Sequence, residues 1–348
     1  MLTDRIEAKW IDCFERTLAL CAVEAGDAVA ILSETQSRPL NVHLAELALA
    51  RLGARAFHVV VPTPAQNAPV PIRSTGASDA IGGLAPAIAA LARSTLVVDL
   101  TVEGLLHAPE LPEILADGAR LLMVSNEHPE ALERLVPDPA LEQKVKAGFR
   151  MLRSAKEMRV TSDAGTDLSI RLEGARPGGV WGYCTKPSQV AHWPGGLCLA
   201  FPAAGSVSGR LVMAPGDVNL TFKRYLETPV TLTIEDDYVT RIEGPGADAA
   251  LMESYFAAWG DREAYAVSHV GWGMNPAARW DAMTMYDRRD INGTELRAFA
   301  GNFLYSTGAN EVAGRYTPGH FDLPMRGCTI ELDGSTVIDR GALQGDLA

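Results

Sequence analysis

DAVAILSETQSRPLNVHLAELALARLGARAFHVVV, residues 27–61, sets the pattern of the first half of the chain. Its apolar run 27–32 predicts a buried strand, and residues 39–52 predict a helix that ends at Gly53, where a capping glycine is typical. Residues 55–61 predict a second strand. A strand, a helix and a strand in this order indicate a parallel pair, because parallel neighbours need a crossover connection.

The same alternation covers about the first 150 residues. Apolar residues at helical spacing over 3–24 precede the first strand. Beyond residue 61 the sequence predicts a helix at 79–93, a strand at 94–100, a helix at 110–117, a strand at 119–124 and a long helix at 138–158. Strands interleaved with helices predict an α/β fold with a doubly wound parallel sheet.

The rhythm changes beyond about residue 159. Residues 159–171 predict two strands around an Ala-Gly turn. One more helix is expected at 246–259, and short strands are expected at 197–202, 208–213, 217–221, 229–235, 238–243, 265–270 and 327–339. We therefore expect an α/β domain over 1–158 and an α+β domain over 159–348 with a largely antiparallel sheet, a division that suits a chain of 348 residues.

Composition excludes several classes of protein. The formal net charge of -12 argues against a nucleic-acid surface, which needs a basic stripe. No apolar run reaches the ~20 residues of a membrane helix, and the charged first twenty residues do not resemble a signal peptide. Five scattered cysteines without a C-x-x-C pair predict reduced thiols in a cytoplasmic protein, with neither a disulfide framework nor a thiolate zinc site.

The segment YTPGHFD, residues 316–322, contains an H-x-D pair. On an extended strand His320 and Asp322 would point to the same face, about 6–7 Å apart along the backbone. With His269 they would form two imidazoles and one carboxylate, the ligand set of non-haem Fe(II) oxygenases. No spacing rule joins His269 to the pair, so a strand with a surface histidine and aspartate unrelated to His269 is the alternative.

The remaining histidines differ in context. His43 falls within a predicted helix, His58 within a strand and His128 at a helix start, and we expect all three to be structural. His107 follows the strand at 94–100, and ligands of open α/β sheets gather outside the carboxyl ends of strands. His192 lies in a Trp-Pro-Gly-Gly loop that would hold its side chain at a fixed angle. Position alone leaves functional and structural roles open for His107 and His192.

Motifs of other enzyme classes are missing. The sequence contains neither G-x-x-x-x-G-K-[ST] nor H-E-x-x-H, and Val207 stands where a G-x-S-x-G motif needs its nucleophile. Gly82 and Gly83 open no dinucleotide-binding fingerprint. The sequence therefore gives no support to a P-loop enzyme, a nicotinamide enzyme or a serine hydrolase.

Several segments resemble the 2,5-dihydroxypyridine 5,6-dioxygenases of bacterial nicotinate and nicotine breakdown, a family with the fold of the aminopeptidase T (M29) metallopeptidases. The segments are VVDL at 97–100 with LLH at 105–107, HWPG at 192–195, SHVGWG at 268–273, RAFAGNFLYSTG at 297–308 and HFDLP at 320–324. Their order and spacing suit a match over most of the chain, which implies an M29-like fold.

This resemblance implies a ring-cleaving dioxygenase of the extradiol type, with one Fe(II) per chain held by His269, His320 and Asp322. The implied reaction inserts dioxygen between C5 and C6 of 2,5-dihydroxypyridine to give N-formylmaleamate. His107 and His192 are the candidates for the base that accepts a substrate proton and for a later proton donor.

Leu106, Ser306 and Thr307 are the candidate substrate contacts, the last two expected in a loop before the strand of Asp322. The expected partners are a small hydroxypyridine and dioxygen, without organic cofactor, nucleic acid or membrane. The resemblance also suggests a homo-oligomer, with a homohexamer as its form.

A metallo-aminopeptidase is the alternative function. M29 peptidases resemble this chain at the closing H-x-D but bind two metals with additional glutamates, one of them in a Phe-Pro-x-Gly-Glu stretch where this chain has FPAAGS at 201–206. A serine cannot replace a carboxylate between two cations, which favours a single transition ion. The segment GVWGYC at 179–184 lacks an acidic residue expected in the dioxygenases, which leaves the ring substituents of the substrate open. A single-zinc hydrolase and a non-enzymatic binding protein are further hypotheses.

Overall fold

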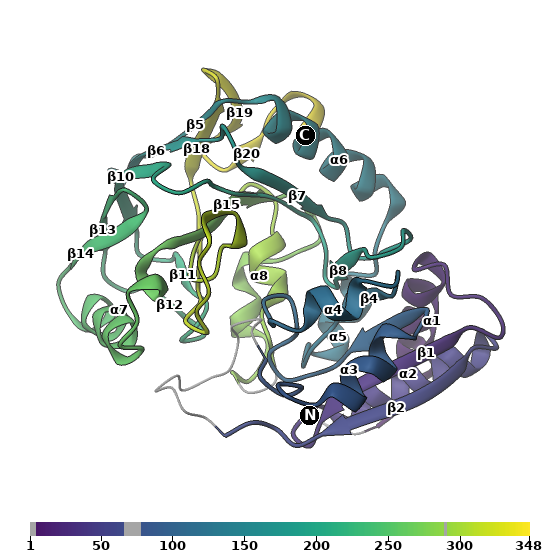
Figure 1. Ribbon diagram of the computed structural model, residues 1–348. Coiled ribbons are helices and arrows are strands. Elements are labelled where there is room, and N and C mark those ends of the chain that lie inside the picture. The colour runs from purple at the N-terminus through teal and green to yellow at the C-terminus, as the bar shows by residue number, and fades with distance from the viewer. Residues whose placement is uncertain (1–4, 66–77, 289–290) are drawn as a thin grey trace.

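The computed structural model describes residues 5–65, 78–288 and 291–348, which build two units side by side (Figure 1). The first unit, purple to blue in Figure 1 except for the teal β8, contains a parallel five-stranded sheet with the strand order β2-β1-β3-β4-β8. Its strands are β1 (Ala28–Glu34), β2 (Arg55–Val61), β3 (Leu96–Asp99), β4 (Arg120–Met123) and β8 (Val190–His192). The predicted doubly wound sheet is confirmed.

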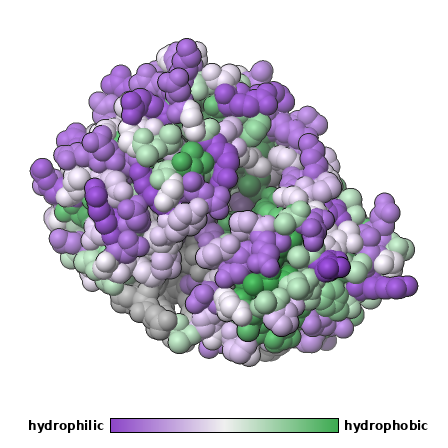
Figure 2. Space-filling view, viewed as in Figure 1, coloured by the Kyte–Doolittle hydropathy of each residue, from purple (hydrophilic) through white to green (hydrophobic). Residues whose placement is uncertain are grey.

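Helices cover both faces of this sheet, as its buried strands require. On one face, side chains of α1 (Ala8–Leu20), α2 (Pro39–Arg51) and α5 (Pro129–Arg134) form a core with alternate residues of β1 and β3. On the other face, α3 (Ala85–Ala92) and α4 (Leu111–Leu115) pack against the remaining residues of the same strands. Figure 2 shows apolar surface over this unit, where Leu47, Phe57, Val60 and Leu84 are exposed.

The long helix α6 (Pro139–Ser154) begins at Asp138, whose carboxylate accepts the N–H of Ala140 at 2.8 Å, and leads into the second unit. An eight-stranded sheet there has the order β14-β13-β10-β6-β5-β18-β19-β20, and a five-stranded sheet has the order β17-β16-β15-β9-β7. The strand pairings of both sheets are antiparallel throughout the described residues, as expected. The largest apolar core joins strands of both sheets, α6 and α7.

The eight-stranded sheet consists of β5 (Glu157–Ser162), β6 (Asp167–Arg171), β10 (Val207–Met213), β13 (Val230–Glu235), β14 (Tyr238–Glu243), β18 (Cys328–Leu332), β19 (Ser335–Asp339) and β20 (Ala342–Leu343). The five-stranded sheet consists of β7 (Arg176–Val180), β9 (Leu197–Phe201), β15 (Val267–Gly273), β16 (Phe303–Thr307) and β17 (Phe321–Met325). The second unit also holds the small pair β11 (Val218–Asn219) and β12 (Arg224–Tyr225), helices α7 (Ala247–Ala258) and α8 (Thr294–Ala298), and 3-10 turns at Arg262–Tyr265, Trp280–Thr284, Glu311–Ala313 and Gly345–Leu347.

One strand departs from the expected order along the chain. β8 lies beyond residue 159, yet it pairs in parallel with β4 and completes the sheet of the first unit. The chain then returns at β9 to the five-stranded sheet. The chain therefore passes between the two units more than once, and β8 places His192 at the boundary between them. No helix in the described ranges has the length and apolarity to cross a bilayer.

Candidate metal centre

A cavity of about 470 Å³ lies between the two units, outside the carboxyl ends of β3, β4 and β8. This is where ligands of open α/β sheets bind. The first unit contributes its lining from the loop after β3, from α4 and from β8. The second unit contributes side chains of β7, β9, β15 and β17, so both units are needed to build the site.

Asp99 shapes the loop after β3. Its buried carboxylate accepts the hydroxyl of Thr101 at 2.6 Å, the N–H of Thr101 at 3.0 Å and the N–H of Leu105 at 2.8 Å. Burial raises the pKa of Asp99 to about 6, against the opposing effect of these hydrogen bonds. The loop so fixed carries Leu106 and His107 to the cavity wall.

His192 enters from the end of β8. Its Nδ1 lies 2.6 Å from the carbonyl oxygen of Pro194. A carbonyl only accepts, so Nδ1 carries the proton and Nε2 is left with a lone pair. Burial lowers the pKa of His192 to about 4, which keeps the ring neutral at neutral pH.

His269, His320 and Asp322 come from two strands of the second unit. His269 belongs to β15, Asp322 to β17, and His320 directly precedes β17. Asp322 Oδ1 lies 3.3 Å from His320 Nε2 and 3.9 Å from His269 Nε2. These three side chains, which the sequence could not join by spacing, line one cavity together.

His107 approaches the same point from the opposite unit. Its ring centroid lies 4.6 Å from that of His320 and 6.2 Å from that of His269. One ring nitrogen from each of the three imidazoles lies within 4.8 Å of the others. The cluster therefore offers three imidazoles and a carboxylate, one imidazole more than the sequence predicted for the metal.

Two neighbours fix the carboxylate of Asp322. Arg297 of α8 donates from Nε to Oδ2 at 2.5 Å, and the Ser306 hydroxyl donates to Oδ1. Burial alone would raise the pKa of Asp322, but the Arg297 guanidinium and the imidazoles of His320 and His269 hold it well below its usual range. Asp322 is therefore an anion at neutral pH.

The imidazoles of His269 and His107 favour their neutral form. Burial lowers the pKa of His269 to about 3, and burial together with His320 and His269 holds the pKa of His107 well below its usual range. The Nδ1 atoms of His269 and His320 are buried without a hydrogen-bond partner among the described residues. Two imidazoles with unsatisfied buried nitrogens beside one ionised carboxylate fit a divalent transition ion.

The candidate substrate contacts lie in different places. Leu106 lines the cavity. Ser306 and Thr307 do not belong to its lining, and the expectation that they sit in a loop is wrong, because both belong to the buried strand β16. Ser306 contacts Asp322 instead, and the Thr307 hydroxyl has no hydrogen-bond partner within the described part of the chain.

Sequence reasoning missed Arg297, Phe201 and Asp99. Phe201 packs edge-on against His269, with ring centroids 5.4 Å apart, and Arg297 holds the predicted ligand Asp322. Arg297 and Asp99 stood inside segments that carried the family resemblance, and Phe201 opens the FPAAGS stretch that was compared with the peptidases; these were the available signals. No periodicity or motif marks a residue whose partner lies on another strand.

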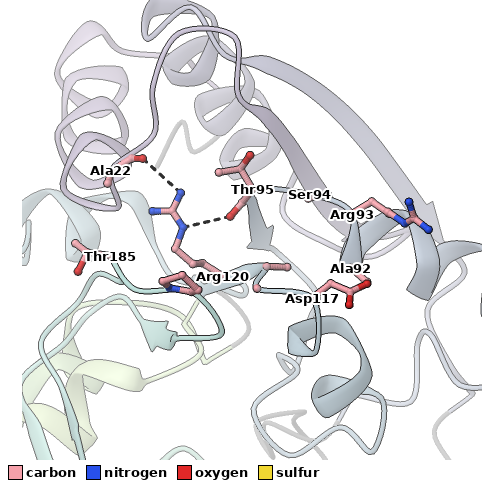
Figure 3. A pocket seen from close by; sticks show the side chains of 11 residues that line it. Ala22, Ala92, Arg93, Ser94, Thr95, Asp117, Arg120 and Thr185 are labelled. Atoms are coloured by element: carbon pink, nitrogen blue, oxygen red, sulfur yellow. Dashed lines mark hydrogen bonds between the residues drawn. The ribbon is translucent and has the colours of Figure 1, made fainter.

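A second cavity of about 720 Å³ lies at the opposite end of the parallel sheet, near the start of β4 (Figure 3). Arg120 lines it, but its guanidinium donates to the carbonyl oxygens of Thr95 at 3.2 Å, Ala22 at 3.4 Å and Cys21. This arginine therefore ties the turn after α1 to the sheet. Among the described residues, the clustered histidines line the first cavity and not the second.

Comparisons with known proteins show the family of this chain. A 2,5-dihydroxypyridine 5,6-dioxygenase of Pseudomonas putida KT2440 is 38% identical over 341 residues, covering 96% of this chain and 95% of that protein. The structure of 2,5-dihydroxypyridine dioxygenase from the same organism superposes with a TM-score of 0.92 at 36% identity, covering 98% of this chain and 99% of that one. AmpT from Thermus thermophilus, at 15% identity, has a TM-score of 0.64 over 97% of this chain and 99% of its own, which confirms the expected M29-like fold. The family model of 2,5-dihydroxypyridine 5,6-dioxygenase (NicX) matches residues 9–345, and the chain belongs to this family.

Proposed function

We propose that this protein is a non-haem Fe(II) dioxygenase that opens 2,5-dihydroxypyridine between C5 and C6 to give N-formylmaleamate. Membership of the dioxygenase family supports the reaction. The observation that carries the proposal is the convergence of two buried histidines and an ionised aspartate on one cavity, with two further histidines at its wall.

His269, His320 and Asp322 would hold the iron, one ion per chain. Two imidazoles and one carboxylate are the usual protein ligands of Fe(II) oxygenases. Bound Fe(II) supplies a centre at which dioxygen and an electron-rich ring can exchange electrons. Arg297 and Ser306 orient the carboxylate, and Phe201 supports the ring of His269.

His107 and His192 would move protons. Both line the cavity, and their lowered pKa values make them neutral at neutral pH. A neutral imidazole can accept the proton of a ring hydroxyl and return it later. The Nε2 atom of His192 is free to accept, because Nδ1 faces the carbonyl of Pro194.

The reaction balances without an organic cofactor. Both atoms of dioxygen enter the product, the C5–C6 bond breaks, and the ring supplies the electrons. Leu106 would pack against the ring; substrate contacts from Ser306 and Thr307 stay predictions of the sequence, as do a homohexamer and a cytoplasmic location.

An oxygen electrode tests this function. Metal-free protein is loaded with Fe(II) under argon and mixed with 2,5-dihydroxypyridine in air-saturated buffer. We expect one molecule of oxygen to be consumed for each molecule of substrate, which is followed by the loss of its ultraviolet absorbance. We also expect one iron per chain. Unchanged oxygen with iron-loaded, folded protein would refute the reaction, and two metals per chain would favour the aminopeptidase.

Variants separate ligands from proton-transfer residues. His269→Ala, His320→Ala and Asp322→Ala are each expected to lose most of the bound iron, because each removes one of three protein ligands. His107→Ala should retain iron and lose turnover. Iron is measured by metal analysis after desalting. If His107→Ala also loses its iron, the three-imidazole arrangement is the metal site instead.

A further inference from the structure

We infer that the cavity also accepts 2,5-dihydroxypyridines with an uncharged alkyl group at ring carbon C3. This substrate class rests on the proposed function and extends it. It follows from the size of the cavity, from the order of residues along its walls and from the geometry of the ring.

The cavity is larger than one small ring requires. Its volume of about 470 Å³ falls within the roughly 300–1,000 Å³ of pockets that hold drug-sized ligands. A single six-membered ring with two hydroxyl groups is much smaller than such a ligand. Space therefore remains beyond the ring when it lies against the histidine cluster.

The paired strands β7 and β9 show where this space lies. Phe201, Leu199 and Leu197 alternate along β9 and line the cavity, opposite Arg176, Gly178 and Val180 of β7. Phe201 packs against His269, so the Phe201 end of the β7–β9 pair lies next to the proposed metal ligands. We call this end of the cavity the metal end. At a rise of ~3.3 Å per residue, Leu197 lies ~13 Å further along the strand.

The first unit adds further apolar residues to the lining. His192 marks the metal end of β8, and Val190 lies two residues away on the same face of that strand. Leu111 and Leu115 of α4 also line the cavity, one helical turn apart. Val190, Leu111, Leu115, Leu197 and Leu199 form what we term the apolar end of the cavity.

Charged lining residues lie toward the other end. Asp322 and Arg297 pair beside the imidazoles. Arg176 lies over the ring of Phe201, 5.1 Å from its centroid, and pairs with Glu311 at 3.4 Å. An alkyl group suits the apolar end, whereas a carboxylate there would lose its hydration without gaining a partner.

Ring geometry selects C3. The bond to be cleaved, C5–C6, must face the metal end. The C2–C3 bond lies directly across the ring, so a substituent on C3 points toward the apolar end. The chemistry is unchanged: both oxygen atoms enter, C5 becomes a carboxylate, C6 a formyl group on nitrogen, and the alkyl group stays on the carbon next to the amide.

The experiment compares iron-loaded protein with the parent compound and with its 3-methyl, 3-propyl and 3-carboxylate derivatives. We expect oxygen uptake with the parent and both alkyl compounds, and a KM that falls by up to about fourfold per methylene, the effect of burying one CH₂. The 3-carboxylate, similar in size to small alkyl groups, should show at least a tenfold lower kcat/KM.

Val190 provides a matched pair of variants. Val190→Phe should fill the apolar end and lower the ratio of kcat/KM for 3-propyl to parent compound at least tenfold. Val190→Ala should raise or keep that ratio. A purely structural effect would change both substrates alike and leave the ratio constant. Leu115→Phe, on α4, replaces Val190→Phe if the latter does not fold.

The outcomes are distinct. Turnover of the parent compound with rejection of both alkyl compounds would overturn the inference and leave the proposed function intact. Equal turnover of the 3-carboxylate and 3-propyl compounds, or a constant ratio in both Val190 variants, would also overturn it. Failure with every compound by iron-loaded protein would overturn the proposed function, and the inference with it.

Discussion

Single residues of this site depend on partners far away in the sequence. Asp322 accepts from Arg297 and Ser306, and these contacts leave the carboxylate edge near His320 and His269 for a cation. The H-x-D spacing pointed to His320 and Asp322, because one residue separates them along a single extended segment of the chain. Arg297 stayed unrecognised, since its contact depends on how α8 packs against β17.

Two of the histidines that the sequence predicted to be structural have contacts that depend on local structure. His128 begins α5, where its Nδ1 accepts the N–H of Glu130 at 3.2 Å. His58 lies on the edge strand β2, 3.6 Å from Glu46. Helix starts and edge strands follow from nearby residues, so the sequence suffices for them.

The buried His192 predicts a pH-dependent stability of the metal-free protein. Its pKa falls from 6.5 to about 4 on folding, so the unfolded chain binds more protons between these values. The stability that the neutral ring confers is complete above pH 6.5 and is lost as pH falls toward 4, by ~1.4 kcal/mol per pH unit. Urea unfolding at pH 7, 6 and 5 measures it.

His192→Gln is the control for this slope. Glutamine does not titrate, so the free energy of unfolding of the variant should depend less steeply on pH over the same window. The difference in slope isolates His192 from His269 and His107, which titrate in both proteins. Parallel curves for the two proteins would contradict the assignment.

At the scale of elements, the loop after β3 is held by one carboxylate. Asp99→Asn should lower kcat about 10- to 100-fold. The asparagine NH₂ group would replace one carboxylate oxygen and face a backbone N–H that also donates, so the loop that carries His107 would shift. Small displacements of a catalytic side chain have effects of this size. Iron content should stay unchanged, since the proposed ligands belong to the second unit. Steady-state kinetics and metal analysis measure both.

Asp27→Asn is the matched control, a carboxylate at the other end of the same sheet that accepts the N–H of Glu24 at 2.9 Å. It should leave kcat and iron content near their original values. Loss of iron in Asp99→Asn would show that the loop supports the metal rather than His107.

Strands with clear patterns were predicted, and strands without them were not. The hairpin of β5 and β6 was expected because its residues alternate between buried and exposed. β16 is buried along its whole length and β7 reads Arg-Pro-Gly-Gly-Val, so neither shows the alternation of a half-buried strand. The place of Ser306 and Thr307 was missed for this reason.

At the scale of the molecule, the two units meet through buried charges beside α8. Arg134 of the first unit lies 2.8 Å from Glu295, and the carboxylate of Glu127 accepts the N–H of Thr294 at 2.6 Å. Arg297 follows on the same helix and reaches Asp322. The first unit therefore helps to place the helix that orients the proposed metal ligand.

Arg134→Met should destabilise the protein by about 2–4 kcal/mol, because it removes the guanidinium paired with the buried Glu295 and leaves the Arg279 N–H, at 2.7 Å, as a donor to this carboxylate. Urea unfolding followed by tryptophan fluorescence measures the change. The double variant Arg134→Met, Glu295→Gln should recover part of this loss, since the uncompensated charge is gone. Additive losses in the double variant would show that the two side chains do not act as a pair.

The arrangement of each unit was more predictable than their junction. Alternating strands and helices predict a doubly wound sheet from local pattern alone, and turn residues predict the antiparallel half. The convergence of His107, His192, His269 and Asp322 depends on how the units face each other, which no local pattern encodes. Family resemblance brought these residues together before the structure did.

The return of the chain at β8 limits how such an enzyme can evolve. Residues 190–192 supply the last strand of a sheet whose other members end by residue 123, and they carry a histidine of the cavity. A recombination event that exchanged the amino-terminal half would leave that sheet without its final strand and the cavity without one of its walls. A recombination that keeps this cavity must therefore carry residues 190–192 together with the amino-terminal strands of the sheet.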